Sequence, residues 1–136
     1  MEDTCTESEP STGFEFPVTI YYEDTDFTGY VYHANYLKYF ERAREQILGV
    51  KRLALLYQQG HHFVVHNIEL KFLQPAGHGD SLTIKSRYQL QGARLIFLQR
   101  AWRDETLLVE ARIETVCVNR SGRPRRVPEQ IRQHLV

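Results

Sequence analysis

The chain alternates apolar and polar positions with a period of two soon after its start, which is typical of a strand with one buried face. This alternation runs from Phe14 to Tyr22, with the apolar residues at every second position. Pro17 lacks the backbone N–H that a sheet ladder needs, which favours a place at a sheet edge. The segment from Asp24 to Gly29 then predicts a turn, because Asp, Thr and Gly supply side-chain caps and backbone freedom.

A helical period follows this turn. Apolar residues recur at spacings of three and four and predict one long helix, on a stripe formed by Tyr36, Leu37, Phe40, Ala43, Ile47 and Leu48. Gly49 is expected to end that helix. A shorter apolar segment from Leu53 to Tyr57, closed by Gly60, predicts a second, minor helix.

The remainder of the chain is strand-like. One strand places a shared face on Val64, His66, Ile68, Leu70 and Phe72. Further strands are predicted at 82–90, 94–103 and 107–118, and a short terminal helix from Pro128. The order predicts an α+β domain with a single long helix against a five-stranded sheet, whose last four strands form an antiparallel meander.

The strand at 94–103 is apolar on both faces. Leu95, Phe97 and Ala101 lie on one side, and the other side carries Ile96, Leu98 and Trp102. Because one helix cannot cover both faces of a sheet, a second surface must cover the other. This predicts a homo-oligomer, for which a two-fold dimer is the commonest arrangement.

The composition fits one folded domain. The chain has 136 residues, of which 42% are hydrophobic, so a disordered chain is excluded. Residues 1–13 are expected to form a flexible acidic tail and residues 14–136 the domain. Lys plus Arg and Asp plus Glu both number 17, and this neutrality argues against a nucleic-acid partner. The balance hides an acidic start and a basic cluster between Arg120 and Arg126.

The residues present argue against a membrane span, a disulfide framework and a metal site. No apolar run reaches the length of a membrane span and the acidic start does not resemble a signal peptide, so we expect a cytoplasmic protein. Cys5 and Cys117 supply neither a disulfide framework nor a four-ligand zinc site, and both thiols are expected to be free. Three histidines lack a nearby Cys partner, so no metal site is predicted at His61, His62 and His66.

The densest group of reactive side chains lies between the first strand and the long helix. It includes Tyr22, Asp24, Asp26 and His33. The first turn of a helix leaves backbone N–H groups unsatisfied, and these can hold a carbonyl oxygen that gains negative charge. A nearby carboxylate can act as a nucleophile or take a proton from water. Spacing alone leaves another interpretation open, in which Asp24 or Asp26 only caps the turn and the tyrosines are core residues.

The segment from Val18 to Gly49 carries a specific resemblance. It reads VTIYYEDTDFTGYVYHANYLKYFERAREQILG and resembles the hotdog-fold acyl-CoA thioesterases of the 4-hydroxybenzoyl-CoA thioesterase class. Within that class it is similar to the Tol-Pal-associated, YbgC-like branch. Later segments look like the same branch, among them FVV at 63–65, Pro75 with Ala76, and GARLIFLQR at 92–100. The resemblance covers nearly all of the chain after the first thirteen residues.

The resemblance implies a hotdog fold, in which a five-stranded antiparallel sheet wraps around one long helix. It also implies pairing of two subunits with the active site at their interface, in a homodimer or a homotetramer. The implied activity is hydrolysis of an acyl-CoA substrate to the free acid and CoA, without a cofactor or a metal.

Residue roles follow from the same resemblance. Asp26 matches the catalytic carboxylate, as nucleophile or general base, and the backbone N–H at His33 matches the group that polarises the carbonyl oxygen. Tyr22 and the His33 side chain match positions that shape the pocket, bond the carboxylate or protonate the leaving thiolate. Gly29 matches a point where the backbone passes close to substrate, and Arg94 matches a basic position for the CoA phosphates.

Other functions stay open. Gly92 and Ala93 stand where some relatives have further basic residues, so acyl carrier protein is an alternative donor. A non-catalytic hotdog protein that binds acyl thioesters or acyl carrier protein, in an envelope or phospholipid-synthesis complex, is a second hypothesis. A hotdog dehydratase is a third, less favoured because the residues from Asp26 to His33 resemble the thioesterase motif.

Overall fold

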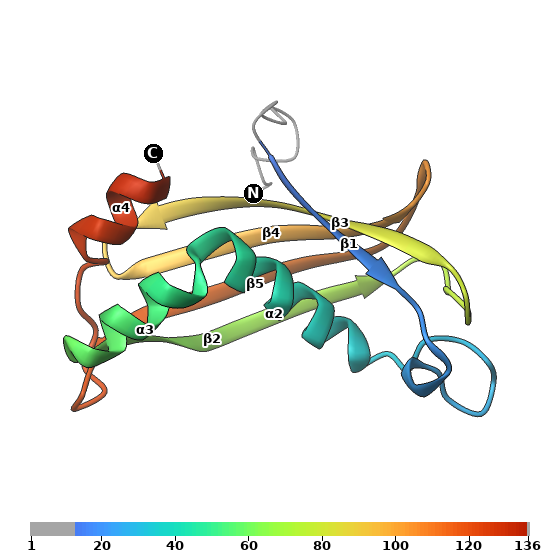
Figure 1. Ribbon diagram of the computed structural model, residues 1–136, viewed down its shortest axis with the longest axis horizontal. Helices are drawn as coiled ribbons and strands as arrows, with labels where there is room; N and C mark the ends of the chain where they lie inside the picture. Colours follow the sequence, from blue (N-terminus) through green and yellow to red (C-terminus); the bar gives the residue numbers. More distant parts are fainter. Residues whose placement is uncertain (1–12, 136) are drawn as a thin grey trace.

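Five antiparallel strands wrap around one long helix in the computed structural model, which describes residues 13–135 (Figure 1). The strands are β1 (Phe14–Thr19), β2 (His61–Phe72), β3 (Ser81–Gln91), β4 (Arg94–Arg103) and β5 (Thr106–Asn119). The helices are the 3-10 turn η1 (Tyr22–Asp24), the long α2 (Asn35–Leu48), α3 (Val50–Gln58) and α4 (Glu129–Leu135). The α+β hotdog prediction is confirmed. The predicted acidic tail lies, except for Gly13, outside the described residues.

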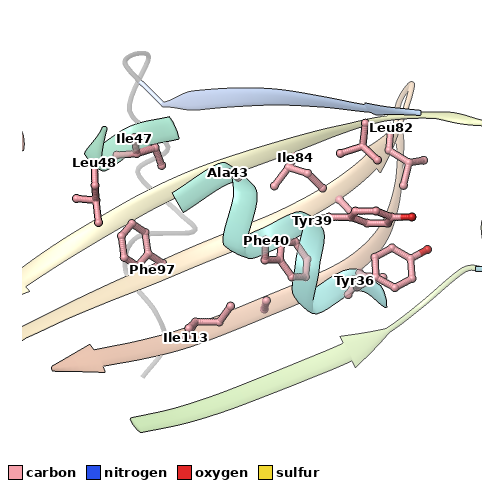
Figure 2. Packing of buried hydrophobic residues seen from close by; sticks show 14 of the residues in the cluster. Tyr36, Tyr39, Phe40, Ala43, Ile47, Leu48, Leu82, Ile84, Phe97 and Ile113 are labelled. Carbon is pink, nitrogen blue, oxygen red and sulfur yellow. The ribbon is translucent and has the colours of Figure 1, made fainter. Parts of the chain in front are cut away.

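The helix α2 packs its apolar stripe onto one face of the sheet. Figure 2 shows these side chains against Ile84 of β3, Phe97 of β4 and Ile113 of β5. The buried residues of the helix are Tyr36, Tyr39, Phe40, Ala43, Ile47 and Leu48. Tyr39 joins the predicted stripe, whereas Leu37 is only half-buried. Gly49 ends the helix with φ +90°, a conformation that other residues rarely adopt.

The strand order corrects one prediction. The sheet runs β1-β3-β4-β5-β2, so β3, β4 and β5 form a meander but β2 does not precede it as a neighbour. Instead β2 pairs with β5 at the far edge, with Val64 opposite Val116 and Leu70 opposite Ala111. Alternation along a strand reports which residues share a face, but it carries no information on which strand lies beside it. The edge position predicted for the first strand from Pro17 is confirmed.

The face assigned to β2 also needs correction. The pairing with β5 shifts register between Val65 and Asn67, where one extra residue enters β2. Ile68 lies opposite the buried Ile113, and before the bulge Val65 lies opposite Thr115. The helix-facing side of β2 is therefore shared by Val65 and Ile68, while Val64 faces the other way. A single extra residue moves every side chain beyond it to the opposite face of the sheet.

The first strand is shorter than its alternation predicts. Strand β1 ends at Thr19, and the chain then forms η1 at Tyr22–Asp24. The Asp24 carboxylate accepts a hydrogen bond of 2.8 Å from the Tyr21 N–H and so turns the backbone out of the sheet. A short-range polar contact thus overrides the period-two pattern.

The outer face of β4 differs from the apolar surface expected there. Ile96 is only 1% exposed in a single chain. Charged side chains lie on the same face of the sheet, where Arg94 is 3.8 Å from Glu114, the residue opposite Ile96, and Arg100 is 3.3 Å from Glu110. Their aliphatic stems can cover apolar surface while the charges stay in water. Much of the exposed apolar surface instead lies along β2 and just beyond it, at Val64, Val65, Ile68, Phe72 and Leu73.

Candidate active site

A small hairpin between η1 and α2 carries the predicted catalytic carboxylate. Thr25 and Val31 pair as an antiparallel bridge, and the Asp26 N–H donates to the Tyr30 carbonyl over 2.9 Å. The Tyr32 N–H donates to the Asp24 carbonyl over 3.0 Å, which extends the pairing. Asp26 therefore lies where the turn of the hairpin begins. Two further pairs of hairpin residues separate it from the segment that enters α2.

The loop that joins β2 to β3 holds this hairpin on both sides. The Val31 N–H donates to the Ala76 carbonyl over 2.8 Å, at the end of the hairpin. Before the hairpin begins, the Ile20 N–H donates to the Asp80 carbonyl over 2.9 Å. The whole segment that carries Asp26 is thus tied at both ends to one loop.

That loop is itself anchored by one ion pair. A single nitrogen of Arg103, at the end of β4, donates to Asp80 Oδ2 over 3.0 Å and to the Pro75 carbonyl over 3.1 Å. Asp80 Oδ2 also accepts the Gly77 N–H over 2.9 Å. The Gly77 hydrogen bond and the neighbouring guanidinium hold the pKa of Asp80 below its ordinary value.

Thr28 binds one oxygen of the Asp26 carboxylate. Asp26 Oδ1 accepts the Thr28 backbone N–H over 2.9 Å and the Thr28 hydroxyl over 2.5 Å. Within residues 13–135, no hydrogen bond reaches Asp26 Oδ2. These two hydrogen bonds, led by the hydroxyl, and the charge of nearby His33 lower the pKa of Asp26, so the side chain is an ionised carboxylate near neutral pH.

The start of α2 leaves backbone donors available. The Asn35 N–H donates to the Tyr32 carbonyl over 2.8 Å, but in the part of the chain that the structure describes the His33 and Ala34 N–H groups donate to no acceptor. The Asn35 side chain donates to Asp24 Oδ1 over 2.8 Å, which joins η1 to the helix start. Asp24 thus has the turn-stabilising place expected of it, and the N–H groups at the helix start can donate to an external oxygen.

A hollow of about 280 Å³ lies beside this helix start. It lies between His33 and Tyr36 on one side and Phe72, at the end of β2, on the other. The rings of His33 and Phe72 meet edge-on with centroids 6.3 Å apart. The Tyr36 hydroxyl is buried without a partner among the described residues. Burial raises the pKa of Tyr36 to about 12, so this phenol stays protonated at neutral pH.

The remaining predicted site residues have different surroundings. Tyr22 is 79% exposed on η1, with its ring 6.0 Å from that of His78, and no described hydrogen bond joins it to Asp26. Gly29 has φ +86° and donates to the Asp26 carbonyl over 3.0 Å, so the turn itself requires a glycine there. The roles of Tyr22 and Gly29 toward a substrate stay predictions.

Arg94 is not brought together with Asp26 in one chain. It begins β4, opposite Gln91 at the end of β3, whereas Arg103 at the other end of β4 contacts the loop that holds the hairpin. Strands rise about 3.3 Å per residue, so the length of β4 separates Arg94 from that end of the sheet. The two ends are visible in Figure 1, with the segment leading into α2 at one end and α4 at the other.

Sequence patterns missed Thr28, Asp80 and Arg103. The spacing Asp-x-Thr in a polar turn is a usable signal for Thr28, because a hydroxyl two residues after an Asp can reach its carboxylate. Asp80 and Arg103 are 23 residues apart and meet only in the folded chain. In residues 13–135 no group of three or more His, Cys, Asp or Glu side chains could hold a metal ion. None of the helices there is long and apolar enough to cross a membrane.

A family model for the thioesterase-like superfamily matches residues 21–135, which include the hairpin, α2 and all strands except β1. The chain belongs to this superfamily. The acyl-CoA thioesterase YbgC of Haemophilus influenzae is 39% identical to this thioesterase-like protein over 111 residues, covering 79% of this chain and 82% of the relative. The acyl-CoA thioester hydrolase YbgC of Escherichia coli is 38% identical over 126 residues, covering 89% and 94%.

Solved structures support the same family. A probable thioesterase from Bartonella henselae matches this thioesterase-like chain with a TM-score of 0.80 and 40% identity, over 86% of this chain and 100% of that one. A 1,4-dihydroxy-2-naphthoyl-CoA thioesterase from Synechocystis matches with a TM-score of 0.83 at 22% identity, which bears on the fold alone. The resemblance to the YbgC-like branch is therefore confirmed.

Proposed function

We propose that this protein hydrolyses acyl-CoA thioesters to the free acid and CoA, with Asp26 as its catalytic carboxylate. The observation that carries the proposal is the hairpin, which holds an ionised carboxylate with one unbonded oxygen beside a helix start with unpaired N–H groups. The names of the YbgC relatives supply the substrate class. CoA is the expected donor, and acyl carrier protein is a competing one.

The chemistry requires two events at the thioester. The His33 N–H, and with it the positive end of α2, stabilises negative charge as it develops on the carbonyl oxygen. Asp26 either attacks the carbonyl carbon to form an anhydride that water then hydrolyses, or takes a proton from the attacking water. In both routes the C–S bond breaks, the CoA thiolate leaves and takes up a proton, and the acid is released. The hollow beside His33 and Phe72 would receive the acyl group next to the carbonyl.

The proposal includes a homodimer joined along β2. The outer edge of β2 is unpaired in one chain, and its side chains Val65 and Ile68 are 48% and 40% exposed. Antiparallel pairing of two β2 strands would bring the His61 end of one copy to the Phe72 end of the other. A hollow of about 510 Å³, which lies between α2, α3 and the start of β2, would then face the Asp26 site of the second copy. A tetramer would need a further interface.

This arrangement also gives Arg94 a role. Arg94 pairs with Val116 of β5, which in turn pairs with Val64 near the start of β2, so all three lie toward the same end of the sheet. The side chain is 52% exposed, and its carboxylate partner Glu114 is shared with Arg112. In an antiparallel dimer that end of the sheet would lie toward the Asp26 site of the second copy, and we propose that Arg94 meets a CoA phosphate there.

The decisive experiment compares wild type with Asp26→Asn on acyl-CoA substrates from short aliphatic to aromatic. The amide has the shape of the carboxylate but no charge, so we expect kcat to fall about 10²- to 10⁴-fold while the melting temperature stays near that of wild type. Asp104→Asn, in the exposed turn between β4 and β5, is the matched control and should keep the wild-type rate.

Two results would overturn the proposal. Full activity of Asp26→Asn would remove Asp26 from the chemistry. Absence of hydrolysis across the substrate panel by folded wild type, together with capture of acyl carrier protein, would favour the non-catalytic binding protein.

A further inference from the structure

The turn after Asp26 contains a hydroxyl whose direction is fixed by its neighbours. The Tyr30 backbone N–H approaches Thr28 Oγ1 at 3.4 Å and supplies a donor to it. The hydroxyl hydrogen must then point elsewhere, and Asp26 Oδ1 lies 2.5 Å away. Thr28 therefore acts as a donor toward Asp26, and its backbone N–H donates to the same oxygen over 2.9 Å.

We propose that Thr28 is a positioning residue for the proposed hydrolysis, because it holds Asp26 Oδ1 and leaves Oδ2 as the oxygen that reacts. This inference rests on the proposed function. It assigns different tasks to two oxygens of one carboxylate: Oδ1 fixes the direction of the group, and Oδ2 attacks the thioester carbon or takes the proton of water. A carboxylate with a single reacting oxygen in a fixed direction reaches the reactive geometry without first losing rotational freedom.

A turn cap alone does not need this arrangement. The Thr28 backbone N–H already satisfies the turn through Oδ1, and Gly29 donates to the Asp26 carbonyl over 3.0 Å. The neighbouring side chain Phe27 is 100% exposed, so it adds no buried packing to the turn. The hydroxyl adds a second donor to an oxygen that already has one, so it acts on the carboxylate as well as on the turn.

The second donor also changes the basicity of Asp26. Donors to the ionised form lower the pKa of the carboxyl, and the Thr28 hydroxyl is the largest contributor. The titratable side chain in electrostatic contact with Asp26 is His33, from the segment that enters α2. Asp24, in the other arm of the hairpin, is directed toward Tyr21 and Asn35. Loss of the hydroxyl should therefore raise the pKa of Asp26 toward its ordinary value.

The experiment measures kcat and KM against pH for wild type, Thr28→Val and Thr28→Ser. Thr28→Val keeps the backbone N–H and the shape of the side chain but removes the hydroxyl. We expect kcat to fall roughly ten- to a hundredfold with little change in KM, since the carboxylate is no longer held in one direction. The reaction requires ionised Asp26, so the acid limb of kcat/KM should move to higher pH in Thr28→Val and return in Thr28→Ser.

Two controls assign the result to this hydrogen bond. Thr25→Val removes another hydroxyl of the same hairpin, one that donates to the Tyr22 carbonyl over 2.7 Å, and should leave the acid limb in place. Repeating the Thr28 series in a His33→Gln background removes the imidazole titration and should preserve the shift. Circular dichroism at each pH shows that the variants stay folded.

The outcomes separate this inference from the proposed function. An active wild type, an inactive Asp26→Asn and a Thr28→Val variant with the wild-type acid limb would overturn the role of Thr28 and leave the hydrolase proposal intact. A lower kcat in Thr28→Val without any movement of the limb would mean that Thr28 only stabilises the turn. If Asp26→Asn keeps full activity, both proposals fail together.

Discussion

The two edges of the sheet are built in opposite ways. Strand β1 has six residues and contains Pro17, which cannot donate to another strand. The chain that leaves it is held internally, with Ile20 bonded to both Gly79 and Asp80. Strand β2 has twelve residues, lacks proline, and exposes Val65 and Ile68 beside an unpaired backbone. One edge is closed against partners and the other is open to them.

This difference supports the proposal that the site is shared between two copies. The β1 edge leads directly into the hairpin of Asp26, where internal hydrogen bonds fix the proposed catalytic carboxylate. The β2 edge ends at Phe72, whose ring contacts His33 and Tyr36, so the open edge and the site are continuous. Long apolar edges are normally covered in native proteins, and the proposed cover is a second β2.

The largest effect should come from a charge on the open edge. Ile68→Lys places an ammonium group where two β2 strands would meet, so we expect a monomer with kcat/KM reduced by about 10² or more. Light scattering after size-exclusion chromatography and the hydrolysis assay check this. Thr19→Lys makes the same change on β1 and should keep both the dimer and the rate. A fully active monomer of Ile68→Lys would contradict the proposal that the β2 edge joins two copies into one active unit.

An intermediate effect is expected from loss of Arg103, which anchors the loop to which the chain after β1 is bonded. Arg103→Ala removes the group that donates to Asp80 and Pro75, so the loop that holds the hairpin should loosen and kcat/KM should fall roughly tenfold. The dimer should persist, which distinguishes this variant from Ile68→Lys. Added guanidinium at low concentration should restore part of kcat, a response that general destabilisation would not give. Arg100→Ala, on the same strand but paired with Glu110, serves as the control.

The smallest effect concerns the proline of β1. Pro17→Val gives this edge a new donor, and we expect unchanged hydrolysis with slow additional self-association visible as light scattering at high protein concentration. The same measurement on wild type gives the baseline. If Pro17→Val stays as dispersed as wild type over the same period, the proline is not what protects this edge.

Sequence patterns predicted the elements whose structure depends on residues close together in the chain. The stripe from Tyr36 to Ile47 and the stop at Gly49 follow from helical geometry, and the bounds of β4 match the predicted 94–103. The family resemblance predicts Asp26 and His33 as site residues, and their roles stay predictions. The neighbour of β2 and the bulge before Asn67 depend on pairing with β5, far away in the chain, so periodicity could not supply them.

The same limit applies to the site. Thr28 acts within two residues of Asp26 and was within reach of a sequence argument. The ion pair between Asp80 and Arg103 forms because the start of β3 lies beside the end of β4. The alternation of residues does not reveal that these two strands are neighbours. The burial of Ile96 could not be predicted for a related reason: it depends on which side chains of the neighbouring strands lie beside it.

The pairing of β2 with β5 has a consequence for how the chain is made. The ribosome completes β2 well before β5. The segment from His61 to Phe72 therefore cannot form its native pairing until β5 has been synthesised. During that interval an apolar strand is available to identical strands on neighbouring chains. His66, Asn67 and Glu69 interrupt it with polar groups, and such interruptions slow unwanted strand association. These polar residues can thus protect the nascent chain while leaving the finished edge free to pair.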